Sequence, residues 1–131
     1  MNSITIYRER ALASAFMPYW ILCSSVPRDS FMKEHHFNSA IADIDAMGQP
    51  IPRISPQLLD TLGTRIAPGE TVELHLTEKD HFLFISTMDG TLSNEVNLVN
   101  CRFHRFMIYT RGGFRKISVP EISSLRVTTM L

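Results

Sequence analysis

The sequence predicts a mainly β protein, an antiparallel β-sandwich or flattened barrel of seven to nine strands with one or two helices inserted after the second strand. The segment Thr71–Thr77 carries the strongest signal, because Val72, Leu74 and Leu76 alternate with polar residues. A period of two places one face of a strand against a core and the other in water. Similar short segments recur along the chain with turn residues between them, which is typical of two stacked sheets.

Two turn dipeptides organise the middle of the chain, Pro68-Gly69 before the alternating segment and Asp89-Gly90 further on. Proline presets φ for a turn, and glycine supplies the positive φ that many turns require. The segment Thr64–Leu98 is therefore expected to form a meander of three strands. Its last two segments should pair around Asp89-Gly90. Three apolar residues are expected to share one side of the last segment: Leu92, Val96 and Leu98.

Two further strands are predicted near the start of the chain. Ile4–Arg10 alternates apolar and polar residues, and Tyr19–Ser24 is a short, continuous apolar run that contains two aromatic residues. A run of this kind is typical of a strand that is covered on both faces.

The region of about residues 25–63 reads as a helical insertion. Val26–Ile44 is expected to form the longest helix, whereas Met47–Ile54 contains two prolines and should be extended. Ser55–Gly63 predicts a second helix, because it begins with Ser-Pro, has an apolar face and ends at glycine.

The end of the chain predicts a second hairpin and one more strand. Cys101–Thr110 and Phe114–Val119 flank Gly112-Gly113, and Pro120 is expected to end the second arm. Ser124–Met130 alternates again and predicts a last strand. The length of 131 residues favours a single domain over residues 1–131.

Composition excludes several classes of protein. The net charge is zero and 44% of the residues are hydrophobic, so we expect a folded domain that binds neither nucleic acid nor membrane. From Asn100 onward six basic residues face a single acidic one, and the rest of the chain carries the opposite excess. Such regions are expected to lie side by side or to meet across a dimer. Two cysteines form no disulfide framework, which favours reduced thiols and a cytoplasmic location; a single bridge between Cys23 and Cys101 is the alternative.

The order of these features resembles small bacterial β-sandwich proteins of unassigned function. The matching segments are Ile4–Arg8, Pro68-Gly69 with Thr71–Thr77, Ser93–Leu98 and Gly112-Gly113. They cover about half of the chain and contain no catalytic signature, so the resemblance implies a fold and no functional residue. The chain departs from this pattern between Ser25 and Gly63, and the insertion is therefore where a special function would lie.

The insertion also holds the candidate metal ligands His35, His36 and Asp43. Metal ligands on one helix are usually three or four residues apart, whereas adjacent histidines point about 100° away from each other. Half-buried or surface histidines are therefore the favoured interpretation. We expect no metal and no cofactor.

Polar loops at one end of the sheet are the other candidate. The proposed binding surface consists of Asp89, Gly90, Ser93 and Asn94. Local hydrogen bonding at the start of a strand is the competing role for Ser93 and Asn94. The sequence contains no nucleophile elbow, phosphate-binding loop or dinucleotide fingerprint, so no catalytic residue is assigned.

These observations favour a noncatalytic binding or interaction module that associates with itself and has a protein or small-molecule partner. Edge strands that need protection are the reason to expect a homo-oligomer. Two alternatives stay open. One is a small metal-dependent enzyme that uses the histidines and acids of the insertion. The other is an exported or surface-attached module with Ala11–Cys23 as its leader.

Overall fold

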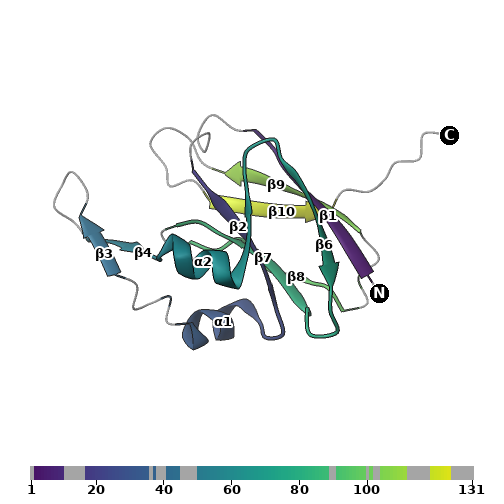
Figure 1. The fold of residues 1–131 in the computed structure, drawn as a ribbon, viewed down its shortest axis with the longest axis horizontal. Helices are drawn as coiled ribbons and strands as arrows, with labels where there is room; N and C mark the ends of the chain where they lie inside the picture. Colours follow the sequence, from purple (N-terminus) through teal and green to yellow (C-terminus); the bar gives the residue numbers. More distant parts are fainter. Residues whose placement is uncertain are drawn as a thin grey trace.

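The computed structural model describes residues 2–10, 17–35, 37, 41–44, 50–88, 91–99, 101, 104–111 and 119–124. Two four-stranded sheets stack on each other, and two short helices cover the outer face of one of them (Figure 1). The predicted β-sandwich with inserted helices is confirmed, and the barrel alternative is not, because the two sheets stay separate.

The first sheet has the strand order β10-β9-β1-β6. Its strands are β1 (Asn2–Arg8), β6 (Thr71–Leu76), β9 (Arg105–Arg111) and β10 (Val119–Ser124). The pairs β1–β6 and β9–β10 are antiparallel, whereas β1 and β9 run parallel in the middle of the sheet.

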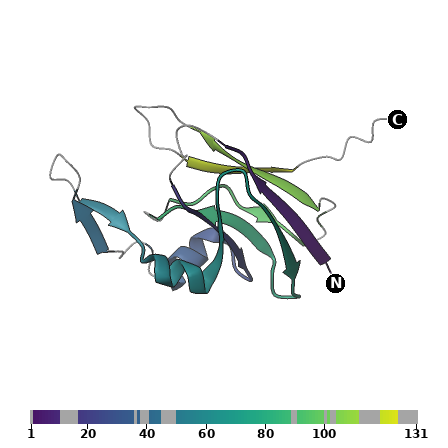
Figure 2. The ribbon, with the colours of Figure 1, turned by 45° about the horizontal axis from the view of Figure 1, so that its top comes forward.

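The second sheet has the order β5-β2-β7-β8 and is antiparallel throughout. Its strands are β2 (Tyr19–Ser24), β5 (Gly63–Ile66), β7 (Phe82–Ser86) and β8 (Val96–Asn97). A separate pair of short strands, β3 (Ile41–Ile44) and β4 (Pro50–Arg53), projects beside the helices (Figures 1 and 2).

The first hydrophobic core fills the space between the two sheets. The inward-facing residues of β1, β2, β5, β7, β9 and β10 make it up: Ile4, Ile6, Tyr19, Ile21, Ile66, Leu83, Ile85, Phe106, Ile108 and Ile122. Val72, Leu74 and Leu76 of β6 are half-buried against this core, and the residues between them are exposed. The predicted alternation of this strand is thus confirmed.

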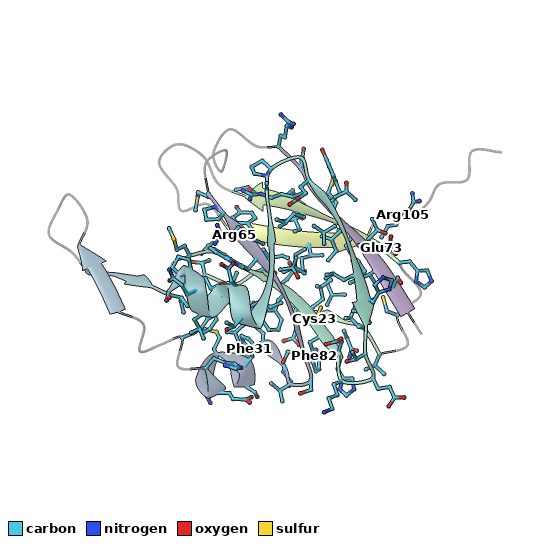
Figure 3. All side chains as sticks on the ribbon, in the orientation of Figure 1. Cys23, Phe31, Arg65, Glu73, Phe82 and Arg105 are labelled. Carbon is cyan, nitrogen blue, oxygen red and sulfur yellow. The ribbon has the colours of Figure 1, made fainter. Side chains whose placement is uncertain are left out.

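A second core lies on the outer face of the second sheet, under α1 (Arg28–Glu34) and α2 (Pro56–Leu62). Trp20, Leu22 and Phe84 point to this side of the sheet and meet Phe31 of α1 and Leu59 of α2. Figure 3 shows Phe31 beside the sheet on this side. The strand β2 is therefore buried on both faces, as its continuous apolar run predicts.

The predicted meander is wrong, because consecutive strands belong to different sheets. The strand β6 lies in the first sheet, and the strands before and after it, β5 and β7, lie in the second. The strands β7 and β8 do pair, with Leu83 opposite Val96. Leu92 packs on the second core while Val96 and Leu98 pack on the first, so the expected shared face is also wrong.

The long helix predicted over Val26–Ile44 is wrong as well. The helix α1 ends at Glu34, and residues 41–44 form β3. Phe31 and Phe37 do meet, with their ring centroids 5.6 Å apart, although Phe37 lies beyond the helix.

The second predicted helix is confirmed as α2, and one side-chain cluster holds it to the sheet. The indole Nε1 of Trp20 donates a hydrogen bond of 2.8 Å to Asp60 Oδ1, and Arg65 of β5 forms a 3.1 Å ion pair with the same carboxylate. The Arg65 guanidinium also lies over the Trp20 ring, 5.0 Å from its centroid. Both partners lower the pKa of Asp60, with the Trp20 hydrogen bond as the larger cause.

The last described strand contains Pro120, which was expected to end a strand over Phe114–Val119. Pro120 lies inside β10, opposite Thr110 of β9. The strand β10 is at the edge of its sheet, where the missing N–H of a proline can face outward. The predicted last strand, Ser124–Met130, falls outside the described residues except for its first residue, as do the turn dipeptides Asp89-Gly90 and Gly112-Gly113.

Cys23 and Cys101 are both thiols rather than a disulfide, and both pack against the first core. Burial, with a smaller contribution from the nearby Asp80 carboxylate, raises the pKa of the Cys23 thiol to about 12. In the described part of the chain no helix is long and apolar enough to cross a bilayer.

Candidate functional site

Of the four residues of the proposed binding surface, Ser93 and Asn94 are described, and both make structural hydrogen bonds. The buried Ser93 hydroxyl accepts a hydrogen bond from the Ile85 N–H at 2.8 Å and donates one to the Asn94 carbonyl at 2.8 Å. The Ser93 carbonyl accepts a bond of 2.7 Å from the Arg28 guanidinium. Ser93 thus fixes the connection between β7 and β8. Asp89 and Gly90 lie outside the described residues.

Asn94 binds the edge of the opposite sheet. Its side-chain Oδ1 accepts a 2.9 Å hydrogen bond from the Ile122 N–H, and its Nδ2 donates one of 3.2 Å to the Ile122 carbonyl. Ile122 belongs to β10, whose inner side pairs with β9. The amide of Asn94 therefore occupies one position of the outer edge of β10.

The candidate metal ligands are not brought together where the structure describes them. The His35 ring is half-buried and lies on Phe31, with a centroid distance of 4.3 Å. His36 and the side chain of Asp43 lie outside the description. Within the described residues, no group of three or more His, Cys, Asp or Glu side chains is placed to hold a metal ion.

A buried arginine joins the two sheets on the side opposite Asn94. Arg8 of β1 is only 1% exposed, and its Nη1 donates a 2.9 Å hydrogen bond to the carbonyl of Ile66 in β5. Its guanidinium lies 3.7 Å from the centroid of the buried Tyr19 ring, and the Tyr19 hydroxyl is 2.8 Å from Thr110 Oγ1. Burial lowers the pKa of Arg8, and the nearby Tyr19 opposes this effect. The contacts to Ile66 and Tyr19 offset part of the cost of burying the charge.

Arg8 also faces the turn that carries the chain from β5 to β6. Pro68 and Gly69 are the central residues of this turn, which the bond from the Glu70 N–H to the Ala67 carbonyl closes at 3.0 Å. Gly69 has a φ of +78°, as the second central residue of a type II turn requires. The backbone carbonyl of Arg8 accepts a hydrogen bond from the Gly69 N–H at 2.7 Å, and the Arg8 backbone N–H donates one to the Glu70 carbonyl at 3.0 Å. Gly69 and Glu70 therefore both lie opposite the single residue Arg8 of β1. This is a glycine bulge, and it fixes the register of β6.

That register decides which backbone groups of β6 point outward. The backbone groups of Arg8 point from β1 toward β6, and those of Ile4 and Ile6 do the same because they alternate with it along the strand. Ile4 and Ile6 lie opposite Leu74 and Val72. The backbone groups of Thr5 and Glu9 point the other way, toward β9, because their N–H groups donate to carbonyls on that side at 2.8 Å. In an antiparallel pair the bonded and non-bonded positions alternate.

The β1 residues whose backbone groups point toward β9 lie opposite Thr71, Glu73 and His75 of β6. The N–H and C=O groups of these three β6 residues therefore point away from β1. Within the part of the chain that the structure describes, no hydrogen bond reaches these outward groups. We call Thr71, Glu73 and His75, with their outward backbone groups, the open edge.

The other three edges of the two large sheets are protected among the described strands. The Asn94 amide and Pro120 occupy the edge of β10. The edge strand β5 has only four residues. The edge strand β8 has two residues. Short strands, prolines and covering side chains are the usual protection of sheet edges. Among the described residues, the six-residue strand β6 has none of these.

The outer face of the first sheet beside the open edge is polar. His75 Nδ1 lies 3.0 Å from the hydroxyl of Ser3 in β1. Glu73 and Arg105 lie on either side of Thr5 and are both exposed. Figure 3 shows their side chains at this face, away from the helices. A strand added to β6 would therefore present alternate side chains to water and to the first core.

Sequence reasoning expected edge strands that need protection but did not say which strand was open. Assigning the edge requires the sheet order, the backbone bonds of Arg8 to the Pro68-Gly69 turn, and the contact of Asn94 with Ile122, which is 28 residues away. Comparison with models of known protein families, with curated proteins and with solved structures finds no match to this chain.

Proposed function

We propose that the protein is a noncatalytic interaction module that binds an extended polypeptide segment along the open edge of β6. The observation that carries the proposal is the contrast between this edge and the other three, which are short or covered. Backbone groups on the open edge supply affinity in strand addition, and pockets for alternate side chains supply selectivity.

The side chains of β6 favour a segment with its own alternation. Val72, Leu74 and Leu76 are half-buried at the rim of the first core, so apolar residues of an added strand would extend that core. Thr71, Glu73 and His75 are exposed on the other face and would meet polar residues. The preferred ligand is therefore a strand that alternates apolar and polar residues over about six positions.

A cytoplasmic location is part of this proposal. Cys23 and Cys101 are half-buried thiols that pack against the first core, as expected for a reducing compartment.

The test uses a displayed library of random octapeptides selected on the full chain. Selected peptides should change the amide resonances of Thr71, Glu73 and His75. The variant Glu73→Pro should reduce their affinity at least about tenfold, because proline removes one outward N–H and places its ring on the edge. It leaves the bonds to β1 intact, since the Glu73 N–H points away from that strand.

Glu73→Ala is the matched control, because it removes the same side chain and keeps the N–H. Peptides should bind this variant to within about threefold of the unchanged chain, since the backbone supplies most of the affinity. Selection of no peptide, equal binding to Glu73→Pro, or resonance changes confined to other strands would each contradict the proposed function.

A further inference from the structure

We infer that the open edge binds a second copy of this chain, by antiparallel pairing of β6 with β6 in one particular register. The inference rests on the proposed function and names the partner of the same site. It places the two-fold axis at Leu74, so that Glu73 of each copy lies opposite His75 of the other. The two first sheets then join into one sheet of eight strands.

The register follows from the bonding pattern of the edge. The residues with outward groups are Thr71, Glu73 and His75, and an antiparallel partner must pair outward residues with outward residues. Placing Glu73 opposite Glu73 is one allowed choice, but like charges directly opposite each other are destabilising. Shifting the second copy by two residues, to the next register in which outward residues meet, places Glu73 of each copy opposite His75 of the other.

The apolar residues favour the same register. With the axis at Leu74, Leu74 lies opposite Leu74 of the second copy, and Val72 lies opposite Leu76. All three are half-buried in one copy, so pairing would complete their burial. Moving the axis to Val72 would place Leu74 opposite Glu70 and lose two of these apolar contacts.

The outer face supplies a donor and an acceptor in this register. His75 Nδ1 lies 3.0 Å from the Ser3 hydroxyl. When that hydroxyl donates to Nδ1, the proton of the neutral ring sits on Nε2, which can then donate to the Glu73 carboxylate of the second copy. Ser3 thereby acts as a positioning residue for the pair.

The β6–β6 pairing ends before Thr77. The Thr77 N–H is bound by Asp80 Oδ2 at 2.8 Å and does not extend the edge. A pair of six-residue strands lies at the small end of protein interfaces, at or below roughly 1,200 Å². The inference therefore predicts a reversible dimer whose population rises with concentration.

Sedimentation velocity of the full chain over a wide concentration range tests the inference. The unchanged chain should shift from monomer to dimer. Glu73→Lys should raise the dissociation constant about tenfold or more, because it affects both symmetric pairs. The exchange Glu73→Lys with His75→Glu places opposite charges across the axis and should recover dimer formation.

Glu78→Lys is the matched control, because Glu78 is exposed in the turn after β6 and makes the same change of charge. It should leave the dissociation constant unchanged. Glu73→Gln separates the two registers: it should weaken the dimer with the axis at Leu74, and strengthen one in which Glu73 faces Glu73. A circular dichroism spectrum of each variant verifies that it is folded.

A chain that stays monomeric at every concentration, although selected peptides bind β6, would overturn the inference and leave the proposed function standing. A dimer that Glu73→Pro does not affect would show that another surface pairs, and would also overturn the inference. A dimer that Glu73→Gln strengthens would overturn the register at Leu74.

Discussion

The side-chain amide of Asn94 exchanges two hydrogen bonds with the backbone of Ile122, as a residue of a neighbouring strand would. Asn94 follows the second sheet's β7 and Ile122 lies in β10 of the first sheet, so one side chain links the sheets and covers an edge. Arg8 also links the two sheets, but the Ile66 carbonyl that it binds is on the side of β5 that pairs with β2. A side chain of the other sheet therefore covers the edge of β10, whereas the described residues place none on the outward groups of β6.

Replacement of Asn94 by alanine should destabilise the protein. It leaves the Ile122 N–H and C=O without the amide, and we expect the free energy of unfolding to fall by about 1–2 kcal/mol. Urea titration measures the change. Asn97→Ala is the control, because its Oδ1 accepts only a local bond from the Val99 N–H at 2.9 Å. Equal losses for the two variants would contradict the role given to Asn94.

Removal of the Asn94 amide should also expose β10 to strand addition. We therefore expect Asn94→Ala to associate more strongly than the unchanged chain in sedimentation velocity. Adding Glu73→Pro should not reverse this gain, since the new edge is on the other side of the sheet. A variant that associates no more than the unchanged chain would argue against edge protection by Asn94.

Tyr19 should contribute to stability in two separable ways. Tyr19→Phe removes the bond to Thr110 and keeps the ring beneath Arg8, so the free energy of unfolding should fall by about 1 kcal/mol. Tyr19→Leu also removes the cation–π contact and should cost about 1–2 kcal/mol more. A double-mutant cycle with Arg8→Met isolates that contact. Equal stability of the phenylalanine and leucine variants would show that the ring contributes nothing through Arg8.

Cys23 should resist alkylation while the protein is folded. Its pKa of about 12 keeps the thiol protonated at neutral pH, and the thiolate is the nucleophile. Iodoacetamide at pH 8, followed by mass spectrometry of the peptides, should modify Cys23 only after unfolding. Rapid modification of native Cys23 would contradict its placement in the first core.

The same shift predicts a loss of stability in alkali. A raised pKa means that the folded protein keeps a proton that the unfolded chain releases at about pH 8.5. The stability that the neutral thiol contributes is therefore present below that pH and is lost as the pH rises toward about 12. Comparison of urea titrations at several pH values with those of Cys23→Ala measures this dependence. Identical pH profiles would exclude Cys23 as its source.

Local pattern predicts the strands of this fold better than it predicts their neighbours. The bounds of β2 follow from its continuous apolar run, and the exposure pattern of β6 follows from its alternation. Alternation says which face of a strand is buried but not which sheet it joins, so the predicted meander wrongly joins β6 to the paired strands β7 and β8. The parallel pairing of β1 with β9 joins segments about a hundred residues apart and has no local signal.

The candidate site shows the same division. Turn chemistry at Pro68-Gly69 is visible in the sequence, and the structure confirms the positive φ of Gly69. The bulge that this turn makes against Arg8 sets the outward groups of β6, and it depends on a tertiary contact. Asn94 was expected to bond locally, and its partner Ile122 could be identified only from the packing of the two sheets.

Amide hydrogen exchange along β6 tests the open edge most directly. In dilute protein the amides of Val72, Leu74 and Leu76 should be protected by β1, and those of Thr71, Glu73 and His75 should exchange rapidly. At high concentration the second set should gain protection while the first changes little. Uniform protection along the strand in dilute protein, or protection of the second set alone, would contradict the account.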